Sequence, residues 1–268
     1  MEMQKILTKA VRGRVWASLF GLFILSPLTA EAQIGEYRNE LAVGVNGGVA
    51  LSSVSFTPEV PQGQQLGKTL GLTVRYTGEK YFKSICAIVA ELNYTQMGWK
   101  ETIQNIDDEP VVNSLTGVAE EYSRTINYIQ VPIFARLGWG RERRGLQAYF
   151  QVGPQLGYYL SESTEANFDL DHPNISDRVS VVSRPDYSNM YHMPVENKLD
   201  YGIAAALGLE FSHRRLGHIM VEGRYYYGLG NIYGNTKRDF FGKSNFQAIM
   251  IKTTYLFDFM RTKNQKIK

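Results

Sequence analysis

This chain has little that would form disulfides, attract nucleic acid or cross a membrane as a helix. Cys86 is the single cysteine, so no disulfide can form within the chain, and its neighbours Ile85 and Ala87 suggest a small buried or lipid-facing side chain. The formal net charge of +3 falls to about +1 without residues 1–32, which hold four basic and two acidic residues, and this near balance predicts no nucleic-acid partner. Beyond Gln33 there is no run of about 18 apolar residues, which excludes a helical membrane protein.

The N-terminal stretch is typical of a secretory signal peptide. Basic residues between positions 5 and 14 precede an apolar run over 15–25, and Ala30, Glu31 and Ala32 form a small-x-small cleavage pattern. The apolar run is shorter than the about 20 residues of a spanning helix, so a membrane anchor is the weaker interpretation. We predict a signal peptide over 1–32, cleavage between Ala32 and Gln33, and one domain over 33–268 of an exported protein.

Period-two alternation is the strongest pattern in the rest of the chain. Between Leu146 and Leu160, apolar side chains occupy one parity, while glutamines, glycines and tyrosines occupy the other. Similar runs recur at about 40–54, 66–78, 84–99, 122–138, 199–211, 217–228 and 244–259, so we expect eight strands. Aromatic residues near the run ends, among them Tyr94 and Trp99, indicate girdles at the membrane interfaces, although strand propensity alone explains any one of them.

The connections between these runs alternate in length. Short, charged ones lie at 78–83, 140–145 and 212–217, and longer polar ones at 55–65, 100–120, 161–198 and 229–243, where 105–121 has room for a helical turn or two. Outer-membrane barrels keep short turns in the periplasm and long loops outside. A soluble sandwich gives the same alternation, but glycines within the strands favour the curvature of a small closed barrel. We therefore predict an all-β protein, an eight-stranded antiparallel up-and-down transmembrane β-barrel, with strands over about 40–259 and a basic periplasmic tail over 260–268.

The polar parity predicts a filled interior. An eight-stranded barrel is only just wide enough for side chains, so charged groups inside it are expected to pair with one another. Glu210 and Glu222 are expected to pair with Arg224, Arg136 or Lys252, and a narrow ion path is the alternative. The predicted lumen network consists of Arg75, Glu91, Gln130, Arg136, Gln151, Glu210, Glu222, Arg224 and Lys252.

Catalytic, cofactor and metal sites are not indicated. The histidines, His172, His192, His213 and His218, lie in the longest connection or beside a short turn, and in Ser212-His213 adjacent side chains point apart with no third group to orient the base. The glycines of 228–234 match a dinucleotide pattern without a βαβ unit, so they indicate a turn. The acidic residues between Asp169 and Asp177 lack the glycine and terminal glutamate of an EF-hand, and no zinc spacing occurs.

Three stretches resemble the PorT-like outer-membrane β-barrel family of Bacteroidetes. Residues 128–137 (YIQVPIFARL) resemble its strand of tyrosine, aliphatic residues and proline, 151–158 (QVGPQLGY) resemble its fifth-strand glycine pattern, and 222–232 (EGRYYYGLGNI) its seventh-strand signature. The resemblance implies an eight-stranded barrel in the outer membrane, and the best-known members of that family assist type IX secretion and gliding. The chain departs from many barrels because the aromatic Phe259 is followed by Met260 and a basic tail.

These observations together predict a non-enzymatic barrel of the Gram-negative outer membrane. We expect a structural, assembly or interaction component of the envelope, with a link to type IX secretion implied by the resemblance. A small-solute, porin-like pore is the alternative. The expected partners are outer-membrane lipid and other envelope or secretion proteins, with no cofactor and no nucleic acid.

Overall fold

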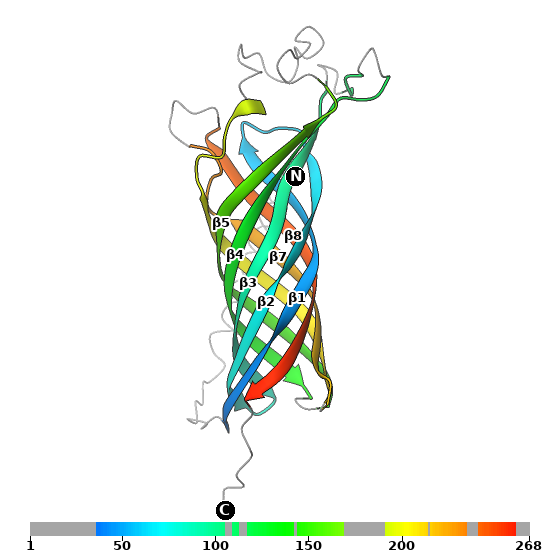
Figure 1. Cartoon of the computed structure of the whole chain (residues 1–268). Coiled ribbons are helices and arrows are strands. Elements are labelled where there is room, and N and C mark those ends of the chain that lie inside the picture. Colours follow the sequence, from blue (N-terminus) through cyan, green and yellow to red (C-terminus); the bar gives the residue numbers. More distant parts are fainter. Residues whose placement is uncertain are drawn as a thin grey trace, which may run out of the picture. The chain divides into compact units, whose positions relative to one another are not determined.

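The computed structural model is an eight-stranded, closed antiparallel β-barrel (Figure 1). It describes residues 36–104, 109–112, 117–141, 144–168, 191–213, 215–234 and 241–260. The strands are β1 (Glu36–Thr57), β2 (Gly63–Tyr81), β3 (Ser84–Thr102), β4 (Glu121–Gly140), β5 (Gly145–Ala166), β6 (Leu199–His213), β7 (Gly217–Gly228) and β8 (Lys243–Met260). The predicted fold class is thus confirmed, and each strand coincides with one of the runs of alternation.

Each strand pairs with the next along the chain, and β8 returns to pair with β1. The seam between first and last strands is long, with Val43 opposite Phe257 and Val49 opposite Ile251. The strands approach closely at Gly48, where a Cβ would collide with the carbonyl oxygen of Ile251. Closure leaves no sheet edge over the paired length, which is the condition for a sheet to cross a bilayer.

Outward and inward side chains differ along every strand. In β4, Ile129, Val131 and Ile133 are exposed on the outside, while Gln130, Phe134 and Arg136 are buried inside. Side chains of this exposed apolar kind define a lipid-facing belt, made of the outward side chains within residues 45–51, 70–76, 88–94, 129–139, 146–160, 199–211, 219–225 and 249–259. In a barrel that crosses a membrane, such a face meets lipid.

The strand walls rise unequally beyond this belt. On β4 the outward side chains between Glu121 and Asn127 are polar, and Asn127 accepts a hydrogen bond from Tyr94 Oη at 2.8 Å and donates one to Ser161 Oγ at 2.9 Å. β1 to β5 are 19 to 22 residues long, whereas β6 and β7 have 15 and 12. The wall built by β1 to β5 therefore extends beyond the lipid at the end of the long connections, which we call the outer end.

Several local predictions are wrong. The first short turn is limited to Phe82 and Lys83, because β2 continues through a bulge near Gly78 to Tyr81. Trp99 is buried in the interior and does not belong to an interfacial girdle. In the connection after β3, where 105–121 has room for a helical turn, the described residues form two bridges, Gln104 to Pro110 and Val112 to Ala119, and residues 105–108 and 113–116 lie outside the described residues.

Some predictions fall outside the described residues. These are the signal peptide, the Ala32–Gln33 cleavage site, the tail from 261 onward, and the segment 169–190 with its acidic residues and His172. Among the residues that the structure does describe, no helix has the length and apolarity needed to cross a membrane.

Candidate functional site in the barrel interior

One set of buried charges lies across the middle of the barrel. Glu91 on β3 accepts hydrogen bonds from Arg224 Nη1 at 2.9 Å, Arg224 Nη2 at 2.7 Å and Lys252 Nζ at 2.7 Å. Arg224 on β7 also donates through Nε to Glu222 at 3.0 Å. The guanidinium thus binds one carboxylate across the lumen and another on its own strand, and Lys252 on β8 completes two positive and two negative charges.

Neutral side chains extend this set. Glu222 accepts hydrogen bonds from Tyr149 Oη and from Gln151 Nε2, both at 2.9 Å. Asn93 Nδ2 donates to Glu91 at 2.8 Å. Charge-assisted hydrogen bonds are stronger than neutral ones, and between buried groups they offset the cost of removing each charge from solvent.

A second set of charges lies nearer the short turns. Glu210 on β6 accepts hydrogen bonds from Arg75 Nη1 at 2.8 Å and from Arg136 Nη2. The Arg136 guanidinium carbon also lies 3.7 Å from the centre of the Tyr149 ring, which belongs to the first set through Glu222. We call both sets together the inner charge network, defined as Arg75, Glu91, Arg136, Glu210, Glu222, Arg224 and Lys252.

The structure buries all nine residues of the predicted lumen network. Seven of them form the inner charge network, and Gln151 donates to it. Gln130 lies apart, because its Nε2 faces Met97 Sδ at 3.5 Å. The cavity beside Arg75, Arg136 and Glu210 has a volume of only about 30 Å³.

His218 brings together a serine, a histidine and two carboxylates that sequence reasoning did not connect. Its Nδ1 lies 2.6 Å from Glu210 Oε1 and 2.9 Å from Ser212 Oγ, and its Nε2 lies 2.9 Å from Asp258 Oδ1. The strand register places Ser212 opposite His218 around the turn. From the sequence, Ser212 was considered with its neighbour His213 and was not connected with His218. Matching the residues on either side of the short turn, His213 with Gly217 and then Ser212 with His218, identifies the pair.

The arrangement around His218 does not resemble an activated nucleophile. Each ring nitrogen faces a carboxylate, and Ser212 shares Nδ1 with Glu210, so the serine has no ring nitrogen to itself. Ser212 Oγ itself lies 3.2 Å from Glu210 Oε1 and is buried. Within the described residues, no three His, Cys, Asp or Glu side chains are grouped so that they could hold a metal ion.

Aromatic side chains fill the lumen toward the outer rim. We define the outer aromatic cluster as Phe56, Trp99, Tyr122, Tyr191, Tyr233 and Phe241, all of them buried. The ring centres of Phe56 and Phe241 are 4.5 Å apart, those of Phe56 and Trp99 5.3 Å, and those of Tyr122 and Tyr191 4.7 Å. Tyr191, Tyr233 and Phe241 come from the connections between strands, so this cluster joins loops to the barrel.

Arg124 is the cation of this outer region. Its guanidinium carbon lies 5.9 Å from the ring centre of Trp99 and 5.8 Å from that of Tyr233. It donates to Tyr233 Oη at 2.9 Å, to the Met193 carbonyl oxygen at 2.6 Å, and through Nε to Glu162 at 3.0 Å. One side chain of β4 therefore holds two connecting segments and β5.

Glu101 lies in the same region, beyond the lipid-facing belt of β3, which ends at Tyr94. Burial raises the pKa of its carboxyl group to about 7, against the opposing effects of the Trp99 indole and Arg124. Trp99 Nε1 donates to the carboxylate at 2.6 Å. Glu101 is therefore a buried carboxyl group of the outer region with a pKa near neutral pH.

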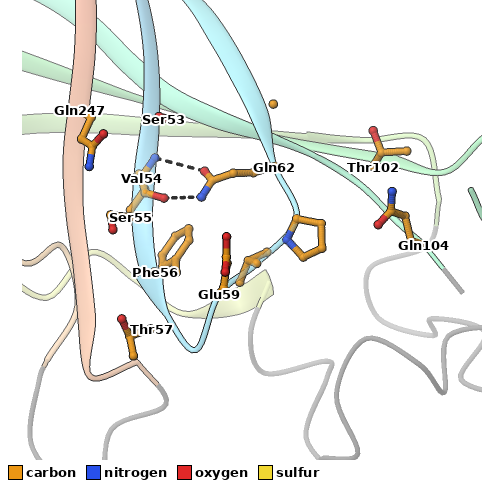
Figure 2. Close-up of a pocket in the computed structure, with 13 residues that line it drawn as sticks. Ser53, Val54, Ser55, Phe56, Thr57, Glu59, Gln62, Thr102, Gln104 and Gln247 are labelled. Carbon is orange, nitrogen blue, oxygen red and sulfur yellow. Dashed lines mark hydrogen bonds between the residues drawn. The ribbon is translucent and has the colours of Figure 1, made fainter. Parts of the chain in front are cut away.

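A polar cavity of about 960 Å³ lies at the outer rim, where the tips of β1 and β2 approach the end of β3 (Figure 2). Figure 2 shows Gln62 reaching across to the backbone of Val54, with Phe56 and Glu59 beside it and Thr102 and Gln104 farther along the cavity. Its lining side chains mostly carry hydroxyl or amide groups. Sequence reasoning did not single out this place, because its residues are divided between two predicted connections and the ends of two predicted strands.

Comparison with known proteins agrees with this architecture. The model of a family described as "Outer membrane protein beta-barrel domain" matches residues 31–234. Solved structures similar to the chain include Ail of Yersinia pestis in complex with the heparin analogue sucrose octasulfate, with 13% identity, a TM-score of 0.33, and coverage of 81% of this chain and 99% of that one.

Two further structures are similar to the same extent. OprG of Pseudomonas aeruginosa has 13% identity and a TM-score of 0.36, covering 83% of this chain and 98% of that one. The Neisserial surface protein A has 10% identity and a TM-score of 0.38, covering 81% and 97%. No curated protein matches the chain.

Proposed function

The chain belongs to the family of outer-membrane protein β-barrel domains, and we propose that it is a sealed, non-enzymatic barrel that serves as a structural or interaction component of the cell envelope. The observation that carries this proposal is the filled lumen. Charged pairs occupy its middle and inner part, and aromatic side chains occupy its outer part. A barrel filled in this way works through its outer and inner rims and its lipid-facing wall.

Electrical recording tests the sealed state. The refolded protein in planar bilayers is expected to give no discrete conductance steps, because the mutual pairing of lumen charges leaves no continuous aqueous path. A variant with Glu91, Glu222, Arg224 and Lys252 all changed to serine loses two negative and two positive charges and is expected to conduct. It is the positive control, because it shows that the recording detects an open lumen. Reproducible steps from the unaltered protein would establish the small-solute pore instead.

We further propose that the partners of this barrel are other envelope proteins, with a role in type IX secretion as the specific form. The resemblance of residues 128–137, 151–158 and 222–232 to the PorT-like family supports this role. Deleting the gene and measuring surface export of secreted proteins tests it, and unchanged export would remove it. Affinity purification from mild detergent then separates a component of an assembly, which carries a stable partner, from a barrel that works alone.

A further inference from the structure

A strand edge at the outer rim is paired with a side chain instead of a strand. β1 and β2 stay in register as far as Ser52 and Gln65, beyond which they diverge while β1 continues to Thr57. The Val54 N–H donates to Gln62 Oε1 at 3.1 Å, and Gln62 Nε2 donates to the Val54 carbonyl oxygen (Figure 2). The Gln62 carboxamide thus makes the two hydrogen bonds that a residue of a neighbouring strand would make.

The geometry of these bonds identifies the chemical group that fits in place of the carboxamide. In an antiparallel hydrogen-bonded pair, each residue donates its N–H to the C=O of the residue opposite and accepts a hydrogen bond from the N–H of that residue. A lone trans amide, such as the acetamido group of a sugar, directs its N–H and C=O to opposite sides and satisfies only one of the two. A residue of an extended polypeptide presents both groups to the same edge.

The cavity beside this edge has the size and lining for such a segment. Its volume of about 960 Å³ lies at the upper end of the roughly 300–1,000 Å³ found for ligand pockets. Side chains with hydroxyl or amide groups dominate the lining, namely Ser53, Ser55, Thr57, Gln62, Thr102, Gln104 and Gln247. Glu59 adds a negative charge. A segment that carries polar side chains and a nearby basic residue would complement this surface.

We propose that the β1 edge at Val54 binds an extended polypeptide segment of another protein by strand addition, with Gln62 as the competitor within the chain. This inference rests on the proposed function, since it names the chemistry of a partner for the outer rim. Main-chain hydrogen bonds supply the affinity in this mode of recognition, and alternate side chains supply the selectivity. The partner residue opposite Val54 displaces the Gln62 carboxamide.

Peptide binding to the full chain in lipid nanodiscs tests the proposal. The probe is a fluorescein-labelled peptide of alternating threonine and valine with a lysine at each end, followed by fluorescence anisotropy. Gln62→Ala removes the competing amide and is expected to increase affinity about tenfold, because two hydrogen bonds no longer have to be broken. Gln64→Ala is the matched control, since Gln64 is exposed and does not line the cavity, and it leaves affinity unchanged.

Two more measurements keep the result interpretable. Gln62→Glu keeps the shape of the side chain but cannot donate to the Val54 carbonyl, so it is also expected to raise the affinity for the peptide. This variant replaces Gln62→Ala as the test if Gln62→Ala does not fold. N-methylation of the central peptide residue removes its donor and is expected to abolish the gain. The Val54 amide resonance, read by NMR, shifts when the unmethylated peptide binds.

Equal affinities for the unaltered protein and both Gln62 variants overturn strand addition, as does equal binding of the N-methylated peptide. A neutral oligosaccharide that shifts the Val54 resonance when the peptide does not would assign the cavity to sugars. None of these results bears on conductance. Failure of this proposal is therefore distinguishable from failure of the sealed barrel.

Discussion

The inner charge network and the outer aromatic cluster fill the same lumen by different means. Every member of the network lies on a strand, so its position follows from strand register and parity. The aromatic cluster takes Tyr191, Tyr233 and Phe241 from connections, which the strand pattern does not position. The strands alone therefore position the inner charge network, whereas the outer aromatic cluster depends also on how the connecting segments pack into the lumen.

The two regions also differ in what a substitution would leave behind. In the network, loss of one partner leaves a charge buried without its counter-ion, which costs more than the pair itself stabilises. In the cluster, loss of a ring leaves a cavity, and its cost depends on how far neighbouring side chains collapse. Substitutions in the two regions therefore test the comparison directly.

The largest effect is expected from Glu91→Leu. The change leaves Lys252 without its carboxylate and Arg224 with Glu222 alone, and we expect the free energy of unfolding to fall by about 5 kcal/mol. Urea unfolding in lipid vesicles measures it. Adding Lys252→Met should restore much of the loss by rebalancing the charges, and a double variant no more stable than Glu91→Leu would refute the coupling. Glu121→Leu, at an exposed ion pair with Lys100, is the matched control and costs about 0.5 kcal/mol.

Trp99→Ala is expected to lower the free energy of unfolding by about 4 kcal/mol in the same assay. It removes a buried ring from the outer aromatic cluster and the hydrogen bond that Trp99 Nε1 donates to Glu101. Trp139→Ala is the control, since Trp139 faces outward and is exposed, and a much smaller loss is expected there. Equal losses at the two tryptophans would mean that the outer cluster is not packed as a core.

Glu101→Gln is expected to stabilise the protein at high pH. The folded pKa of about 7 lies above the ordinary 4.5, so the contribution of Glu101 to stability falls as the pH rises from about 4.5 to about 7 and is constant above that. At 1.36 kcal/mol per pKa unit, the variant is more stable by about 3 kcal/mol at pH 8 and equal at pH 4. Urea unfolding of both proteins across this range measures the difference between them, and a difference that does not grow with pH would contradict the titration of Glu101. Glu121→Gln serves as the control with no such change.

The smallest effect on global stability is expected from Arg124→Met, at about 1 kcal/mol, because Glu162 is partly exposed and can be solvated. Its effect on the outer segments is larger, since Arg124 bonds to Met193 and Tyr233. Amide hydrogen exchange should accelerate about tenfold around 193–197 and 231–233 and remain unchanged at Glu91. Arg141→Met, at an exposed position, provides the comparison, and unchanged exchange at 193–197 would show that Arg124 does not hold that segment.

Strand parity accounts for most of what the sequence predicted, and its limits account for the errors. Parity placed Glu222, Arg224 and Lys252 inside, because period-two alternation assigns a face without knowledge of the partner strand. It gave Arg136 and Arg224 as candidate partners of Glu210 and Glu222, but not which carboxylate meets which guanidinium, nor that Glu210 also meets Arg75. Those choices depend on height along the barrel. Trp99 shares the inward parity of Glu91, yet residue type and closeness to the strand end suggested a girdle.

The outer part of the candidate site could not be predicted for a different reason. Tyr233 and Phe241 lie in a connection without periodicity, so nothing local indicates that they pack on Phe56. The pair of Ser212 and His218 was accessible in principle, because a tight turn fixes which residues face each other across it. The Gln62 contact with Val54 requires the point at which β1 and β2 separate, which no sequence pattern marks.

The seam between β1 and β8 sets the order of events during assembly. Residues 43 and 257 become neighbours only when almost the whole chain has arrived, so the ring closes last and over the greatest sequence separation in the fold. Until then β1 offers a free edge along its length to any other chain nearby. β1 and β8 are therefore the two edges at which an unclosed sheet can mispair, and their pairing with each other removes both.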